Sequence, residues 1–107
     1  MINIDKKNIG ILGLGISGYW AAKLAKSKGA NVFISDSKLD MNNKYAKELI
    51  ELGIDVELGF HSKKILNSDL VIKSPGIPRD IHIIQNLSSS NIEIISEIEF
   101  AYRLSNL

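Results

Sequence analysis

The sequence predicts an α/β protein built in three layers, with a parallel sheet of about five strands and helices on both faces. Short apolar segments alternate with longer amphipathic segments along the whole chain. That alternation is typical of repeated strand–helix units around a parallel sheet, joined by right-handed crossovers. The first apolar segment also runs into a glycine-rich turn and then into an amphipathic segment.

The expected strands are short and rich in apolar residues. Residues 9–12 form an apolar run that ends in glycine, which favours a strand buried on both faces. Residues 55–58 alternate between charged and apolar side chains and predict a weaker strand. The five expected strands are residues 9–12, 31–35, 55–58, 70–73 and 93–95.

The expected helices lie between these strands. In residues 16–28, an apolar stripe at helical spacing is predicted to face the sheet, formed by Ile16, Trp20 and Leu24 with Ala21 and Ala25. Trp20 and Phe100 are therefore both expected in the core. The expected helices are residues 16–28, 42–52, 62–67 (a short one), 80–88 and 96–104.

Length and composition favour one ordinary globular domain. The chain has 107 residues, a net charge of +1 and no cysteine. The balanced charge gives no support for nucleic-acid or membrane-surface binding, and the absence of cysteine excludes disulfides and thiolate chemistry. We expect a cytoplasmic protein, because no apolar run has the length of a signal peptide or a membrane span. The abrupt end in an expected helix suggests one domain of a longer protein.

The turn Gly13-Leu14-Gly15-Ile16-Ser17-Gly18 predicts a phosphate-binding site and gives the fold a Rossmann-like character. Gly13 permits the tight turn, Gly15 lets an anion approach the backbone, and Gly18 lets the helix pack close to the sheet. The N–H groups of Ile16, Ser17 and Gly18 would then point at a diphosphate. The Ser17 hydroxyl is expected to add a hydrogen bond or to cap the helix. A tight turn without a ligand is the alternative.

Polar residues follow the second expected strand. Asp36 stands about 20 residues after the glycines, where dinucleotide-binding domains carry the acid that holds a ribose. Ser37 and Lys38 continue into the next loop and would line the same crevice. The alternative is that Asp36 only caps a helix or stabilises an Asx-turn.

The segment Ser74-Pro75-Gly76-Ile77-Pro78 follows the fourth expected strand. Two prolines around a glycine predict a stiff loop of fixed shape. We expect this loop to form a wall of the crevice beside the glycine-rich turn, without contributing a catalytic group.

No catalytic or metal-binding set is evident in the sequence. His61 and His82 have no partners at metal-ligand spacing, so each is expected on the surface or at a helix end. Glu97 and Glu99 would lie on different helix faces, and we interpret them as favourable charges at a helix N-terminus. No Ser-His-Asp set is predicted.

Together these segments resemble the N-terminal domain of the Mur ligases that add D-glutamate to UDP-N-acetylmuramoyl-L-alanine in peptidoglycan synthesis. The resemblance rests on the glycine-rich turn, on Ile34-Ser35-Asp36-Ser37, on Ser74-Pro75-Gly76-Ile77-Pro78, and on Ile94-Ile95-Ser96-Glu97-Ile98-Glu99-Phe100. It implies that the domain binds the UDP part of the substrate without NAD. The implied UDP-binding residues are Gly15, Ile16, Ser17, Gly18, Asp36, Ser37, Lys38, Gly59, Ser74, Pro75 and Gly76.

The resemblance also implies what residues 1–107 lack. In this family, ATP and Mg²⁺ bind a central domain, which we expect to begin after residue 107, and D-glutamate binds a third domain. ATP activates the substrate carboxylate as an acyl phosphate, which the amine of D-glutamate attacks. The chain is therefore expected to bind one substrate as a monomer, with no metal or cofactor of its own, and to be inactive alone.

Two other classes of protein remain open at this point. The first is the NAD-binding domain of a dehydrogenase or regulatory protein, because Asp36 stands where a ribose-binding acid would. In that class, however, the loop at residues 74–78 has no role. The second is an interaction module that binds no small ligand.

Overall fold

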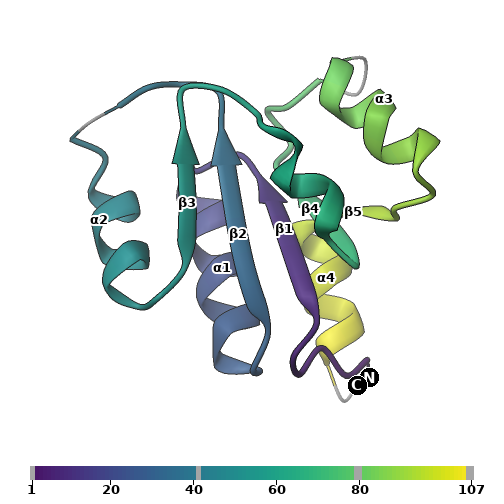
Figure 1. The fold of residues 1–107 in the computed structure, drawn as a ribbon. Helices are drawn as coiled ribbons and strands as arrows, with labels where there is room; N and C mark the ends of the chain where they lie inside the picture. The colour runs from purple at the N-terminus through teal and green to yellow at the C-terminus, as the bar shows by residue number, and fades with distance from the viewer. Residues whose placement is uncertain (1, 41, 79–80, 106–107) are drawn as a thin grey trace.

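The computed structural model describes residues 2–40, 42–78 and 81–105. Strands and helices alternate along them, as the sequence predicts (Figure 1). The elements are β1 (Asn8–Leu12), α1 (Ile16–Ser27), β2 (Asn31–Asp36), α2 (Lys44–Glu51), β3 (Asp55–Leu58), the 3-10 helix η1 (Lys63–Asn67), β4 (Leu70–Lys73), α3 (His82–Ser89), β5 (Ile94–Ser96) and α4 (Glu97–Leu104).

The five strands form one sheet in the order β3-β2-β1-β4-β5, and every neighbouring pair is parallel. β1 lies at the centre and pairs with both β2 and β4. The strand order therefore reverses at β1, which is where open α/β sheets bind their ligands, outside the carboxyl ends of the strands.

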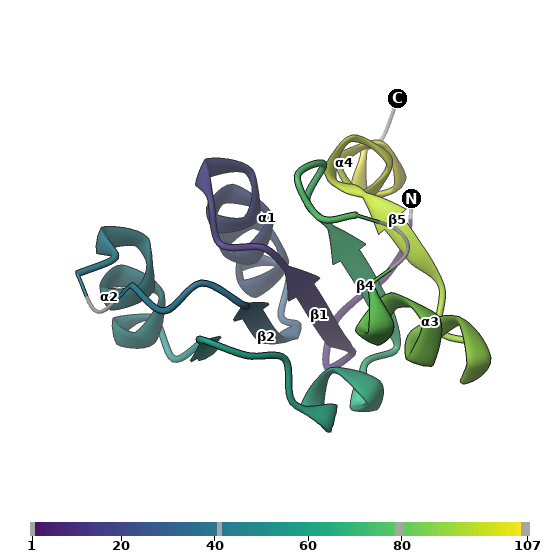
Figure 2. The ribbon, with the colours of Figure 1, turned by 90° about the horizontal axis from the view of Figure 1, so that it is seen from above.

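Helices α1, α2 and α4 cover one face of the sheet (Figure 2). Alternate strand residues such as Ile11, Ile34 and Ile72 point to this face, and none of the three is exposed. They pack against the small side chains of α1, with Phe100 and Leu104 of α4 beside them. Phe100 is only 1% exposed, which confirms its expected place in the core.

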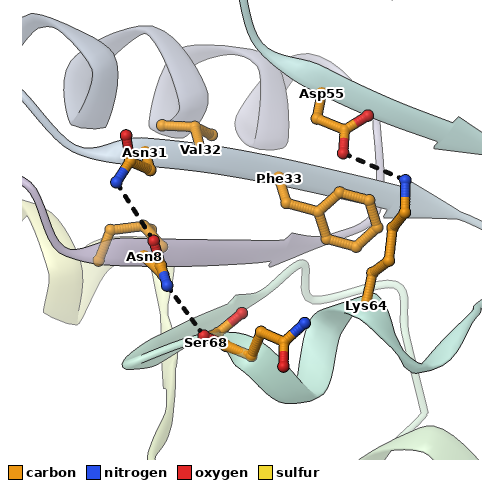
Figure 3. A pocket seen from close by; sticks show the side chains of 9 residues that line it. Asn8, Asn31, Val32, Phe33, Asp55, Lys64 and Ser68 are labelled. Atoms are coloured by element: carbon orange, nitrogen blue, oxygen red, sulfur yellow. Dashed lines mark hydrogen bonds and ion pairs between the residues drawn. The ribbon is translucent and has the colours of Figure 1, made fainter.

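The opposite face carries η1 and α3 (Figure 2). Ile65 of η1 packs so closely on β1 that a Cβ on Gly10 would lie 2.5 Å from its Cδ1 atom. Near the amino ends of β1–β3 this face is hollowed around Phe33, as Figure 3 shows. Lys64 bonds to Asp55 across the hollow, with 3.4 Å between Nζ and Oδ2.

Two expectations for α1 are wrong. Ile16 is 61% exposed and Trp20 is 58% exposed. The buried stripe confirms the expected Ala21 and Ala25 and adds Gly18, Tyr19 and Ala22. Small residues let a helix lie close to a sheet, and in α1 the bulky Ile16 and Trp20 lie outside this contact.

The remaining differences concern element ends. The short helix expected at residues 62–67 is a 3-10 helix, and β5 begins and ends one residue later than expected. α2 begins at Lys44 because the Asn43 side chain caps it, accepting hydrogen bonds from the N–H groups of Tyr45 and Ala46. The start expected for the fourth helix, residue 80, lies outside the described residues.

Candidate functional site

The loops that follow the strands gather at one edge of the sheet. Because all strands are parallel, their carboxyl ends share that edge. It carries the glycine-rich turn after β1, Asp36 at the end of β2, Gly59 after β3 and Ser74 after β4. The predicted site residues are therefore brought to one side of the molecule.

The glycine-rich turn has the geometry that its glycines predict. Gly13 has a φ of +103°, in the region that favours glycine, and its N–H bonds to the Ser35 carbonyl oxygen at 2.9 Å. A Cβ on Gly18 would lie 2.1 Å from the Gly13 carbonyl oxygen. Gly18 is therefore needed for close packing, whereas a Cβ on Gly15 would meet no atom of the described structure within 4 Å.

The N-terminus of α1 faces this open space. Gly15 is the N-cap residue, and among the described residues no side chain caps the helix. Tyr19 makes the first intrahelical bond, from its N–H to the Gly15 carbonyl oxygen at 3.0 Å. The N–H groups of the preceding turn have no intrahelical acceptor, so they and the helix dipole favour an anion here. Ser17 does not cap the helix, contrary to one of its two expected roles.

Asp36 stabilises the same turn from β2. Its Oδ2 accepts a hydrogen bond from the Leu14 N–H at 2.7 Å, and its Oδ1 accepts one from the Lys38 N–H at 2.8 Å. The second bond is the Asx-turn that the sequence left open as an alternative. Ser37 and Lys38 are exposed beside it. Asp36 thus fixes the positions of two loops at this edge.

A buried cluster that the sequence did not predict lies behind Asp36. Ser35 is the only buried polar residue among those described, at 0% exposure. Its Oγ lies 2.8 Å from Glu57 Oε1 and 2.8 Å from His61 Nδ1. Glu57 also accepts the Ser62 N–H at 2.7 Å. Burial alone would raise the pKa of Glu57, but these hydrogen bonds and the nearby His61 hold it below its usual value.

This cluster corrects one expectation. His61 is half-buried and paired with Ser35, so it is neither a surface residue nor the cap of a helix, since Ser62 caps η1. The cluster also brings a serine, a histidine and a glutamate together. They do not form a catalytic triad, because Ser35 Oγ is inaccessible and its hydrogen-bonding capacity is used within the cluster. The cluster instead fixes the loop after β3. In that loop Gly59 has a φ of +97° and bonds to the Asp36 carbonyl oxygen at 2.9 Å.

The loop after β4 lies directly beside the glycine-rich turn, as expected. The Ser74 N–H bonds to the Leu12 carbonyl oxygen at 2.9 Å, and a Cβ on Gly13 would lie 2.7 Å from Ser74 Cβ. The loop is closed by Lys73, whose Nζ donates to the carbonyl oxygens of Ser74 at 3.1 Å and Ile77 at 2.6 Å. These bonds account for a loop of fixed shape.

The first turn of α4 completes this edge. Ser96 caps the helix by accepting the Glu99 N–H at 3.1 Å, and Glu97 and Glu99 both lie in the first turn, as expected. Burial raises the pKa of Glu97, although a hydrogen bond from Ser17 and the charge of Lys73 act in the opposite direction. No pattern in the sequence predicted this proximity of Glu97 to Ser17.

Within the described ranges, no group of three or more His, Cys, Asp or Glu residues could hold a metal ion. His82 is exposed at the start of α3. Over the same ranges, no helix has the length and apolar character that a bilayer span requires.

The strand order and the glycine-rich turn between β1 and α1 define this chain as a Rossmann-like α/β domain. Its sequence matches the family described as the N-terminal domain of MurD-like Mur ligases over residues 7–96. The chain belongs to that family.

Two relatives are named UDP-N-acetylmuramoylalanine–D-glutamate ligase. The one from Cytophaga hutchinsonii is 49% identical over 98 residues, which cover 91% of this chain and 22% of the relative. The one from Bacillus cytotoxicus is 48% identical over 103 residues, which cover 94% of this chain and 23% of the relative. The chain thus spans less than a quarter of the length of these relatives.

Solved structures show the same fold. The UDP-N-acetylmuramate–alanine ligase MurC from Thermotoga maritima superposes with a TM-score of 0.76 at 25% identity, covering 88% of this chain and 21% of that one. A pseudomurein peptide ligase type C from Methanothermus fervidus gives a TM-score of 0.72 at 27% identity. The match covers 87% of this chain and 19% of that one. These comparisons give no support to the dehydrogenase alternative.

Proposed function

We propose that this chain is the substrate-binding N-terminal domain of a ligase that adds D-glutamate to UDP-N-acetylmuramoyl-L-alanine, and that it binds the UDP part of this substrate. The observation that carries the proposal is the N-terminus of α1, which has no side-chain cap in the described structure and opens past Gly15. The names of the relatives supply the identity of the substrate.

In this proposal the diphosphate binds between two loops. Gly15, Ile16, Ser17 and Gly18 offer backbone N–H groups to its oxygens, and the missing Cβ of Gly15 lets it approach. The loop Ser74-Pro75-Gly76 forms the other wall. Its shape is held by the bonds of Lys73 to the Ser74 and Ile77 carbonyl oxygens, which supports a role in positioning rather than in chemistry.

The nucleoside binds toward β2 and β3. Asp36 retains accepting capacity because each of its oxygens has one protein donor and a carboxylate oxygen accepts two. It therefore holds the ribose or the uracil, while the exposed Ser37 and Lys38 lie against them. Gly59, fixed to Asp36 by its N–H, approaches the uracil without a side chain in the way.

The catalytic part of the enzyme lies in the portion of the relatives that this chain does not cover. ATP and Mg²⁺ act there, where ATP activates the substrate carboxylate for attack by D-glutamate. Residues of this chain bind and orient one end of the substrate. The chain alone is therefore a monomer that binds UDP-linked ligands and turns over nothing.

An NMR titration tests the proposal. UDP should shift the amide signals of residues 16–18 and 36–38 while leaving those of α3 unchanged. Affinity should be weak, since the sugar and peptide of the natural substrate contact other domains. If NADH shifts these signals and UDP does not, the proposal is wrong.

A further inference from the structure

Glu97 is a carboxyl group placed beside the proposed diphosphate site. It is the first residue of α4, and its carboxyl lies within hydrogen-bonding reach of the Ser17 hydroxyl in the first turn of α1. Glu97 and Ser17 also line the same cleft between α1 and α4. A negative group therefore stands next to the turn whose N–H groups would receive two phosphates.

The surroundings of Glu97 do not satisfy an ionised carboxylate. Its Oε1 is buried and has no hydrogen-bond partner among the described residues. Lys73 on β4 is the nearby cation, but its Nζ donates to the Ser74 and Ile77 carbonyl oxygens. On α4 itself, Arg103 pairs with Glu93, and Glu99 lies 3.9 Å from Arg103 Nε. None of the other described residues that line this cleft is charged.

An ionised Glu97 would oppose a bound diphosphate in two ways. Its charge would repel the phosphate oxygens across a partly buried site. It would also accept the only proton of the Ser17 hydroxyl, which then could not donate to a phosphate oxygen. A neutral Glu97 removes both effects.

We propose that Glu97 is a positioning residue of the diphosphate site: it is protonated when the diphosphate is bound and donates its O–H to Ser17 Oγ, so that the Ser17 hydroxyl donates to a phosphate oxygen. The inference rests on the proposed function above. At any pH at which Glu97 is ionised in the free protein, ligand binding takes up one proton from solvent. No covalent bond to the ligand forms or breaks.

The direction of the pKa agrees with this assignment. Burial raises the pKa of Glu97 above its ordinary value even with Lys73 nearby, which is the same direction as the shift that a second anion would cause. A diphosphate would raise the pKa further, because two negative groups close together disfavour ionisation of the weaker acid. By linkage, ligand affinity must then fall as the pH rises through the pKa of the free protein.

The test compares three forms of the 107-residue chain: the wild type, Glu97→Gln and Glu99→Gln. The probe is UDP-N-acetylglucosamine, whose diphosphate is a diester and does not titrate near neutral pH. Trp20, the only tryptophan, lines the cleft with Ser17 and Glu97 and reports binding by fluorescence. Titrations run from about pH 5 to about pH 8, a range that covers a raised carboxyl pKa.

We expect the affinity of the wild type and of Glu99→Gln to fall with rising pH, by up to about tenfold per unit above the pKa of Glu97. Glu97→Gln should bind at every pH about as tightly as the wild type does at the lowest pH, because an amide can donate to Ser17 without carrying charge. Calorimetry in buffers of different ionisation enthalpy should show proton uptake for the wild type and less for Glu97→Gln.

Two results separate the failure of the inference from that of the proposed function. Binding by all three proteins with the same pH dependence overturns the role of Glu97 and leaves the UDP site intact. No binding by the wild type at any pH overturns the UDP site itself. An NMR spectrum of Glu97→Gln that matches the wild type outside α1 and α4 shows that the variant is folded.

Discussion

The two halves of the carboxyl edge of the sheet differ in how their polar groups are used. Near β1 and β4, the N-terminus of α1 lacks a side-chain cap in the described structure, and the space at Gly15 is open. Near β2 and β3, Ser35, Asp36, Glu57 and His61 are bonded to one another or to the backbone. The first half offers donors to a ligand, and the second builds the frame that holds two loops in place.

In the proposed function, the open half binds the diphosphate, whereas in the paired half Asp36 both binds the nucleoside and supports the loops. Substitutions at open positions such as Gly15 should change ligand affinity and leave the fold intact. Substitutions in the paired half should lower stability first and affinity as a consequence. Three experiments test this difference between the two halves, and the largest expected effect concerns two glycines of the same turn.

Gly18→Ala should destabilise the domain by about 2–4 kcal/mol, because overpacking forces backbone to move and the new Cβ would lie 2.1 Å from the Gly13 carbonyl oxygen. Gly15→Ala, the matched control, should change stability by no more than about 0.5 kcal/mol, since its Cβ enters open space. Urea denaturation measures the free energy of unfolding of both variants. Gly15→Val should remain folded and lose UDP binding, and retained UDP affinity in this variant would contradict the proposed approach of the diphosphate.

Ser35→Ala should cost about 1–2 kcal/mol, because it removes the buried hydroxyl that bonds to the partly buried Glu57 and His61. Ser37 lies two residues further along and is exposed. The free energy of unfolding of Ser37→Ala should therefore stay within about 0.5 kcal/mol of the wild-type value. Thermal unfolding compares the stability of Ser35→Ala and Ser37→Ala with that of the wild type. A Ser35→Ala protein as stable as Ser37→Ala would show that the cluster does not support the edge.

Glu57→Gln should give the smallest effect, at most about 1 kcal/mol at neutral pH, because solvent screens a largely accessible group. The pKa of Glu57 is lower in the folded protein than in the unfolded chain. Its stabilising contribution is therefore present above the unfolded pKa and is lost as the pH falls through the folded pKa. Unfolding free energies of wild type and variant should converge as the pH falls through the lowered folded pKa of Glu57, whereas a constant difference would exclude this linkage.

The fold was predictable from the sequence because its signals are local. Alternating apolar and amphipathic segments predicted the parallel strands, and the glycine spacing predicted the roles of Gly13 and Gly18. The side of α1 that faces the sheet was not predictable from apolar size alone. The preference for Ala21, Ala22 and Ala25 over Trp20 depends on how closely the helix approaches the strands.

The site was predictable only in part, for a related reason. Residues directly after strands were expected at one edge, and Asp36 and Ser74 lie there. The Ser35 cluster and the proximity of Glu97 to Ser17 join residues far apart in the sequence, without a motif at fixed spacing. A serine at the end of an otherwise apolar strand was the one available signal, because a buried hydroxyl needs partners.

The strand order has a consequence for self-association. β3 and β5 are the sheet's two edges, and each leaves one row of backbone N–H and C=O groups without a neighbouring strand. β5 has only three residues, and β3 carries the charged side chains of Asp55 and Glu57. Short or charged edges discourage another chain from adding to a sheet. We therefore expect concentrated solutions of the domain to resist growth of intermolecular β-structure.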